Sequence, residues 1–203
     1  MKKIEIIWRE LLFQAIEKKN PPAGEADRQF TQKDLSLKFN FSTSTIFQAL
    51  KIPRKMGAVR VTGRFFVLED PEKLLYHWAS VRNIQKDVVF TGYVASPIFE
   101  IEGNMPSDVI FAGFSAARRI LGVSPADYDK VFVYTKNIDF IKKRFDFRKG
   151  RENLIVLRQD PFLAKYGSLT TLSQTFVDLW NLPSWQAKEY VNVLKEKIDG
   201  LLP

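Results

Sequence analysis

The chain has 203 residues, of which 45% are hydrophobic and 13% aromatic, and it carries a net charge of +8. This composition excludes a disordered chain and provides for a core in one large or two small domains. The absence of cysteine excludes disulfides and thiolate metal sites, and a single histidine argues against a histidine-based metal site or a Ser-His-Asp triad. No stretch approaches the roughly 18–20 apolar residues of a membrane helix, and the N-terminus lacks the apolar centre of a signal peptide. We therefore expect a cytoplasmic protein without disulfides, metal or cofactor.

The positive charge is concentrated in the first part of the chain. Residues 1–86 carry 16 basic and 9 acidic side chains, net +7, whereas residues 87–203 carry 15 and 14, net +1. Within residues 31–68 the count is 7 basic to 1 acidic. A basic half joined to a nearly neutral half predicts that one part binds a polyanion and that the other part does something else.

The first predicted elements are three helices. Apolar residues recur at helical spacing from Ile4 to Ile16, which predicts a first helix. It should end near Asn20, because Pro21 and Pro22 cannot continue it, and residues 23–29 should form a polar loop. Thr31 and Asp34 resemble a capping box, which predicts a short second helix over residues 32–39. Asn40 lies in the tight turn that follows, because asparagine tolerates the left-handed conformation.

Ser42 is expected to cap a third helix that runs to about Ile52 and ends at Pro53. One face of this helix is apolar, and the opposite face carries short hydroxyl, amide and cationic side chains. Such side chains reach base edges and phosphates without steric bulk, as a helix in the major groove requires. The residues of this helix and its end that we expect to contact DNA are Thr43, Ser44, Thr45, Gln48, Lys51, Arg54 and Lys55.

A basic hairpin should follow the third helix. Apolar and polar residues alternate over residues 59–67 on both sides of Gly63, and Arg60 and Arg64 lie near the predicted tip. Two helices joined by a tight turn, preceded by a helix and followed by a basic hairpin, resemble the winged helix-turn-helix family. The resemblance implies that the third helix enters the major groove of duplex DNA and that the hairpin, or wing, contacts the backbone or minor groove. A winged helix used for protein contacts is the alternative, and the charge of residues 31–68 argues against it.

The rest of the chain alternates strands and helices, which predicts a mixed α/β domain. Asp70 and Pro71 should begin a helix that bridges the two domains. Beyond it we expect strands at 88–93, 109–112, 130–134 and 154–158, and helices at 115–121, 137–145, 170–180 and 184–199. The expected fold class is α+β or mixed α/β, an N-terminal winged helix-turn-helix plus a C-terminal α/β domain with terminal helices. The expected domains are residues 1–70, a linker helix at 71–86, and an effector or partner-binding domain at 87–203.

One group of residues in the second half suggests chemistry. Gly113 and Ser115 follow a predicted strand, and Asp127 and Asp129 precede the next one. Nucleotidyltransferases place a Gly-Ser turn before a helix and two carboxylates that hold magnesium ions at the next strand. Here Phe114 separates the glycine from the serine, and a third carboxylate is not obvious. We therefore expect a surface turn rather than an active site, with Ser115, Asp127 and Asp129 as the catalytic residues of the alternative.

A second resemblance covers most of the chain. After the winged helix come the segment 111–117 and the late helix 171–180, followed by Leu182 and Pro183. This order is similar to the AbiEi family, antitoxin-type transcriptional regulators of bacterial and archaeal phage-defence operons. The resemblance implies an N-terminal domain that represses its operon and a C-terminal domain that counteracts a cognate toxin. Asp178 matches an acidic position of the late helix, which a cap or salt bridge explains equally well.

The sequence thus predicts a DNA-binding transcriptional regulator that is not an enzyme and is not bound to a membrane. Two alternatives remain at this point. One is a nucleotidyltransferase with a winged helix that targets it to DNA, and the other is a repressor that senses a small molecule through a pocket in its second domain.

Overall fold

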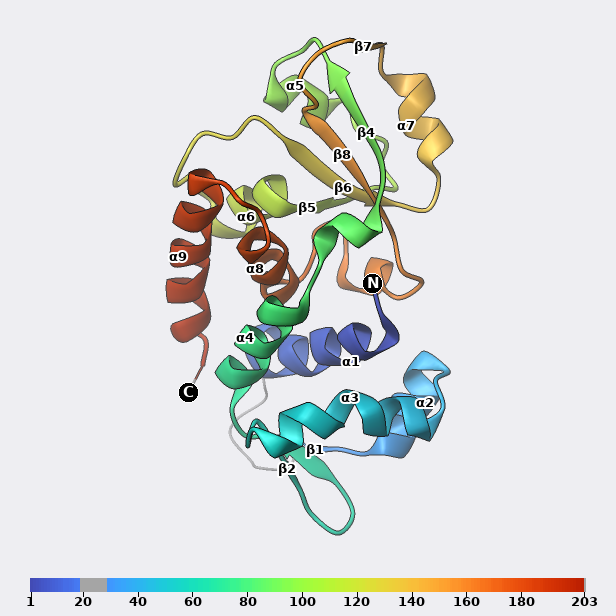
Figure 1. Cartoon of the computed structure of the whole chain (residues 1–203), viewed down its shortest axis with the longest axis vertical. Coiled ribbons are helices and arrows are strands. Elements are labelled where there is room, and N and C mark those ends of the chain that lie inside the picture. The colour runs from blue at the N-terminus through green and yellow to red at the C-terminus, as the bar shows by residue number, and fades with distance from the viewer. Residues whose placement is uncertain (19–28, 203) are drawn as a thin grey trace. The chain divides into compact units, whose positions relative to one another are not determined.

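A computed structural model of the chain describes residues 1–18 and 29–202 (Figure 1). It divides into two compact units. The N-terminal unit contains the described residues of Lys2–Val81 and the last residues from Ile198 onward, and the C-terminal unit contains Arg82–Lys197 with Met1. The fold is mixed α and β, as expected, because both units combine helices with a sheet.

The N-terminal unit is centred on α1 (Lys3–Leu12), which a π-helical turn continues over Phe13–Glu17. The predicted helix end near Asn20 and the loop at 23–28 lie outside the described residues. Helix α4 (Pro71–Val81) packs against α1, and its Trp78 indole nitrogen donates a hydrogen bond to Glu5 Oε2 at 3.3 Å. The division between the units therefore falls after Val81, so that α4 belongs to the N-terminal unit, whereas the sequence suggested a linker helix from residue 71.

Helices α2 (Gln32–Phe39) and α3 (Thr43–Lys55) begin and end with the local signals that the sequence contains. The Thr31 hydroxyl accepts a hydrogen bond from the Asp34 amide at 3.0 Å, and the Ser42 hydroxyl accepts one from the Thr45 amide at 3.2 Å. Asn40 ends α2 in the left-handed conformation, with φ 50° and ψ 44°. Both caps and the tight turn are confirmed, because each depends on residues close together in the chain.

The expected end of the third helix at Ile52 is wrong. Helix α3 continues through Pro53, which is buried, to Lys55. A proline inside a helix leaves the carbonyl four residues earlier without its usual donor. The Trp8 indole nitrogen supplies a replacement, since it donates a hydrogen bond to the Ala49 carbonyl at 2.7 Å. Pro53 therefore destabilises α3 by less than a proline inside a helix usually does.

A three-stranded antiparallel sheet completes this unit in the order β1-β3-β2. The hairpin β2 (Val59–Val61) and β3 (Phe66–Leu68) lies where the sequence predicted it, with Arg60 opposite Val67. Strand β1 (Gln29–Phe30), where the sequence suggested the end of a loop, pairs with β3. The sequence gives little sign of β1 because two residues are too few to show alternation.

The C-terminal unit contains a five-stranded sheet in the order β5-β6-β8-β4-β7. Its central strands β6 (Val131–Thr135) and β8 (Leu154–Arg158) are parallel, and β4 (Val88–Val94), β5 (Ile110–Ala112) and β7 (Phe147–Arg148) pair antiparallel with their neighbours. All of β6 is buried. Burial on both faces is what a near-continuous apolar strand indicates.

The helices of this unit are α5 (Ile98–Gly103), α6 (Gly113–Leu121), α7 (Ile138–Arg144), α8 (Leu172–Trp180) and α9 (Trp185–Asp199), of which the last two residues of α9 are counted with the N-terminal unit. Short 3-10 turns lie at Ile84–Asp87 and Leu163–Tyr166. The expected strands and helices are present within one or two residues of their ends, whereas α5 and β7 were not expected. Both are short, and short elements carry too little periodicity to be detected.

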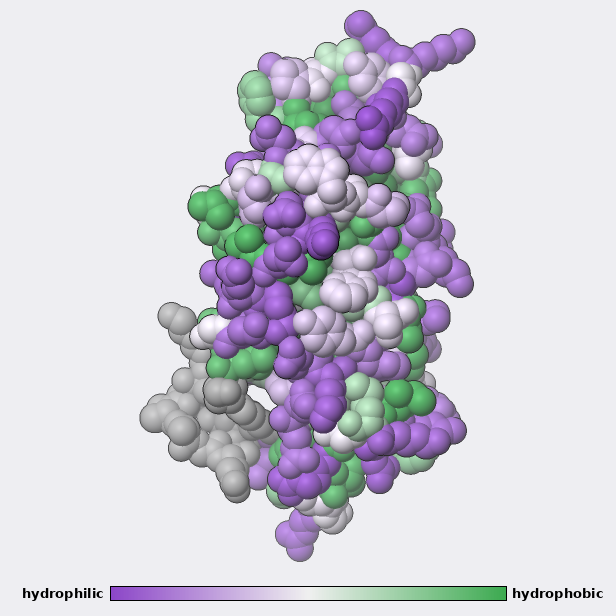
Figure 2. All heavy atoms as spheres, turned by 60° about the vertical axis from the view of Figure 1, so that its left-hand side comes forward, coloured by the Kyte–Doolittle hydropathy of each residue, from purple (hydrophilic) through white to green (hydrophobic). Residues whose placement is uncertain are grey.

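None of the helices in the described residues has the length and apolar character that crossing a membrane requires. The face drawn in Figure 2 carries mostly hydrophilic side chains, with hydrophobic ones in separate patches between them.

Candidate nucleic-acid interface

One face of α3 is buried and the opposite face is exposed. The buried residues are Ile46, Ala49, Leu50 and Pro53. Helix α1 packs against α3, and its Trp8 contacts the carbonyl of Ala49 on this face. The residues expected to contact DNA that are exposed on α3 are Thr43, Ser44, Gln48, Lys51, Arg54 and Lys55. At 100° per residue, Ser44, Gln48, Lys51 and Lys55 fall within one narrow stripe. The stripe carries two cations, Lys51 and Lys55, and Arg54 is exposed beside it. The helix contains no acidic residue, so no opposite charge on the same helix neutralises these three side chains.

Thr45 differs from its neighbours. It is half-buried, its amide binds the Ser42 hydroxyl, and its own hydroxyl lies 3.0 Å from Ser42 Oγ. These contacts stabilise the start of α3. Thr45 therefore belongs to the helix cap rather than to the exposed stripe.

Two apolar side chains flank the stripe. Phe47 and Ile52 are 44% and 45% exposed, which is unusual for residues of this size on a helix with a well-packed inner face. Apolar side chains at such positions can contact thymine methyl groups in the major groove. Ile52 was not among the residues expected to contact DNA, because those were chosen for hydroxyl, amide or cationic side chains.

The two hairpin arginines have different environments. Arg64 is exposed in the turn between β2 and β3, which the Thr62 hydroxyl closes by donating to the Phe65 carbonyl at 2.8 Å. Arg60 lies within β2, where its Nε is 2.5 Å from Glu69 Oε1. Arg64 is therefore accessible to a ligand, whereas the charge of Arg60 is shared with a neighbouring carboxylate.

The residues of the catalytic alternative do not form one site. Ser115 is fully buried, whereas Asp127 and Asp129 are exposed. Asp129 Oδ2 lies 3.5 Å from the Arg151 guanidinium and lines a cavity of about 320 Å³ whose lining does not include Asp127. Within the part of the chain that the structure describes, no three His, Asp or Glu side chains gather as a metal site would require.

The turn before α6 is filled by aromatic side chains. Gly113 has φ +53°, and a Cβ there would approach the Phe132 ring to 3.0 Å, so both conformation and space favour glycine. Phe114 is buried and stacks on Tyr128 with ring centroids 5.3 Å apart. These contacts give the Gly-Phe-Ser segment a packing role at the start of α6.

A buried carboxylate, Glu102, is bound by Tyr128 and by Arg118 of α6. The Glu102 carboxylate accepts hydrogen bonds from Tyr128 at 2.7 Å and from Arg118 at 2.5 Å. Burial acts to raise the pKa of Glu102, but the hydrogen bonds from Tyr128 and Arg118 and the positive charge of Arg118 lower it below its ordinary value. Burial and the same carboxylate raise the pKa of Tyr128 to about 12. Glu102 is therefore held in its charged form.

We expect that magnesium will not stabilise the protein and that replacing Asp127 and Asp129 by Asn will leave DNA binding unchanged. A bound ion would raise the melting temperature by mass action, and two exposed carboxylates without a third ligand provide no closed coordination shell. Thermal shift with and without magnesium tests the first point, and labelled nucleotide incorporation tests for transfer. Turnover that the double substitution abolishes would establish the catalytic alternative.

The C-terminal unit also contains cavities large enough for a small molecule. One of about 350 Å³ is lined by residues of β4, α5, α7 and β7, and another of about 360 Å³ lies near Ser107–Ile110, Lys136 and Ser168. The lining of the first contains both acidic and basic side chains, Glu100 and Asp146 with Arg144 and Arg148.

Comparison with known proteins gives no relative: no family model, no curated protein and no solved structure matches the chain.

Proposed function

We propose that the N-terminal unit is a winged helix-turn-helix that binds duplex DNA, and that the chain acts as a transcriptional regulator. In this proposal α3 lies in the major groove, and the β2–β3 hairpin is the wing that contacts the backbone beside it. The C-terminal unit is an effector or partner-binding domain.

The exposed stripe of α3 is the observation that supports this proposal most. A helix that only packed in a core or stabilised a surface would not need Ser44, Gln48, Lys51 and Lys55 aligned on one side. Amide and hydroxyl groups there can pair with base edges, and the ammonium groups can neutralise phosphates. The buried face and the Trp8 hydrogen bond to Ala49 hold the helix rigid, which reduces the entropy lost on binding.

The sheet supports the same proposal. Strand β1 joins the hairpin to the segment before α2, so the wing is anchored to the unit at both ends of the helix-turn-helix. The described order of helix, strand, two helices and hairpin is the order that winged helices use. Arg64 in the hairpin turn adds a cation at the point where a wing meets DNA.

The role as a regulator of the AbiEi type extends this proposal. It is supported by the resemblance of segments 111–117 and 171–180 to that family, and by the separation of the chain into a basic unit and a second compact unit. A cognate toxin-like protein is the proposed partner of the C-terminal unit. Co-purification of the chain with the product of a neighbouring gene tests this part separately from DNA binding.

Selection from a random duplex library, followed by titration of the selected sequence and a scrambled one, tests whether the chain binds DNA with sequence preference. A regulator should bind the selected duplex on the order of 10³-fold or more tightly than the scrambled one. Equal affinity for both would contradict a regulatory role, and absence of binding to either would contradict the proposal as a whole.

Gln48→Ala is expected to relax the preference at one base pair, at a cost of about 1–3 kcal/mol on the selected duplex. The amide of Gln48 can pair with two groups on a base edge, whereas alanine can pair with none. Gln32→Ala, which removes a half-buried glutamine at the start of α2, is a matched control. Equal weakening on selected and scrambled DNA would assign Gln48 to phosphate contact rather than base recognition.

A further inference from the structure

A second concentration of positive charge lies in the C-terminal unit, although the net charge of residues 87–203 is only +1. Residues 142–151 carry six Lys or Arg and one Asp, net +5, whereas the rest of residues 82–197 carries 11 basic and 12 acidic side chains, net −1. All six cations are exposed. We call them the α7–β7 cationic surface: Lys142, Lys143, Arg144, Arg148, Lys149 and Arg151.

The fold turns these cations outward. Ile141 is fully buried, which fixes α7 so that its last turn presents Lys142, Lys143 and Arg144 to solvent. Strand β7 forms the edge of the sheet, and Arg148 at its end and Lys149 after it are exposed. A helix end is stabilised by one or two cations, and an edge strand is protected by a charge of either sign. Arg148 pairs with Asp146 and Arg151 lies 3.5 Å from Asp129, but neither these pairs nor the helix end and the edge strand account for six cations among ten residues.

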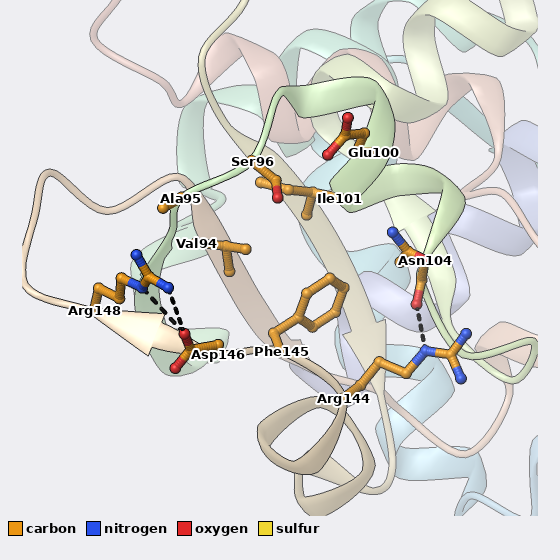
Figure 3. A pocket seen from close by; sticks show the side chains of 10 residues that line it. All are labelled: Val94, Ala95, Ser96, Glu100, Ile101, Asn104, Arg144, Phe145, Asp146 and Arg148. Atoms are coloured by element: carbon orange, nitrogen blue, oxygen red, sulfur yellow. Dashed lines mark hydrogen bonds and ion pairs between the residues drawn. The ribbon is translucent and has the colours of Figure 1, made fainter.

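The two parts of this surface meet at one cavity (Figure 3). Arg144 and Arg148 both line the cavity of about 350 Å³, and Phe145 lies between them. Arg144 uses its Nε to donate to the Asn104 carbonyl at 2.9 Å, which orients the guanidinium group. Arg148 donates to Asp146 Oδ2 from Nε at 3.0 Å and from Nη2 at 2.9 Å, which orients the guanidinium group and shares its charge with that carboxylate. Oriented guanidinium groups are well suited to phosphate oxygens.

We propose that the α7–β7 cationic surface is a second DNA-contacting surface, which binds the phosphate backbone of duplex DNA without reading bases. This proposal rests on the proposed function, because the duplex is the one that the N-terminal unit binds. A second contact in the same chain becomes intramolecular once the first has formed, so a few phosphate contacts increase affinity several-fold or more.

Duplex DNA fits this surface better than a single strand does. Proteins that bind single strands stack successive bases on several aromatic rings. Among residues 138–153, Phe140 is the one strongly exposed ring, whereas Phe145 and Phe147 are half-buried and pack on each other with centroids 6.3 Å apart. The surface therefore offers charge without a series of stacking positions.

The test uses the full chain and a duplex of random sequence, with the salt concentration varied. The measured quantity is the slope of the logarithm of the binding constant against the logarithm of the salt concentration, called the salt slope. Lys143→Gln with Lys149→Gln should lower the magnitude of this slope by about two units, since each lost phosphate contact lowers it by about 0.9. Affinity should fall on the order of 10–100-fold at 0.1 M salt. The control is Lys188→Gln with Lys197→Gln, which removes two exposed lysines from α9 and should change neither quantity.

Each outcome decides between the two proposals. An unchanged slope in the Lys143/Lys149 variant, with binding otherwise intact, overturns this inference and leaves the proposed function standing. Loss of binding in this variant alone, with no effect from substitutions on α3, supports the second surface and contradicts the role of α3. Competition by a single strand of equal length that exceeds competition by duplex would overturn the choice of duplex DNA as the occupant.

Discussion

Asp178→Ala is expected to lower the free energy of unfolding of the C-terminal unit by about 3–5 kcal/mol, because it removes one of the two carboxylates that pair with a buried guanidinium and the acceptor of a buried tyrosine hydroxyl. The Arg82 Nε donates to Asp178 Oδ1 at 2.9 Å, and the Tyr134 hydroxyl donates to Asp178 Oδ2 at 2.9 Å. Asp178 is fully buried, and the Arg82 side chain is 2% exposed. Asp87 is the second carboxylate on Arg82, 2.6 Å away, and it cannot replace the contacts to Nε and to Tyr134.

Urea unfolding together with hydrogen exchange of peptides from β6 and β8 measures this loss in the C-terminal unit. Asp146→Ala is the matched control, since it removes another Asp–Arg pair of the same unit whose two side chains are 77% and 64% exposed. Exposed pairs contribute about 0–1 kcal/mol. Asp178→Asn keeps the shape and one acceptor, so its effect should lie between the two. Similar values for Asp178→Ala and Asp146→Ala would show that the buried network does not stabilise the fold.

This network illustrates where sequence reasoning ends. The sequence suggested that a salt bridge or cap would explain Asp178, but its partner Arg82 lies 96 residues away in the chain. Tyr134 was visible only as one apolar residue of a predicted strand. Contacts between distant residues follow from the order of strands in the sheet, and neither hydrophobic periodicity nor local propensity specifies that order.

Local signals performed better. The hydroxyls of Thr31 and Ser42 each cap a helix through the amide three positions later, and the left-handed Asn40 ends α2, so α2, α3 and the turn between them follow from local signals. The same reasoning misplaced the end of α3, because the group that compensates for Pro53 is an indole 41 residues before Ala49.

The two basic regions of the chain differ in how clearly the sequence reveals them. The basic character of residues 31–68 was evident because few acidic residues interrupt it. The α7–β7 cationic surface was missed because the count over residues 87–203 averages it with the acidic remainder of the unit. A count over a shorter window would have found it, but only the fold shows that all six cations are exposed.

Replacing Lys51, Arg54 and Lys55 together by Gln is expected to weaken binding to every duplex by roughly 10²–10³-fold at 0.1 M salt. The three side chains are exposed at the end of α3, and no acidic residue of that helix neutralises them. If each contacts one phosphate, the log–log salt slope falls by about three units. Because phosphates carry no sequence information, the ratio of affinities for selected and scrambled DNA should change little, in contrast to the effect of Gln48→Ala.

The matched control for this prediction exchanges the cations without removing them, as Lys51→Arg, Arg54→Lys and Lys55→Arg. If charge is what matters, this variant keeps the salt slope, whereas the Gln variant loses it. Circular dichroism of both variants shows whether α3 still forms, because glutamine, lysine and arginine have similar helix propensities. An unchanged slope in a folded Gln variant would remove α3 from the interface and, with it, the main support for a DNA-binding N-terminal unit.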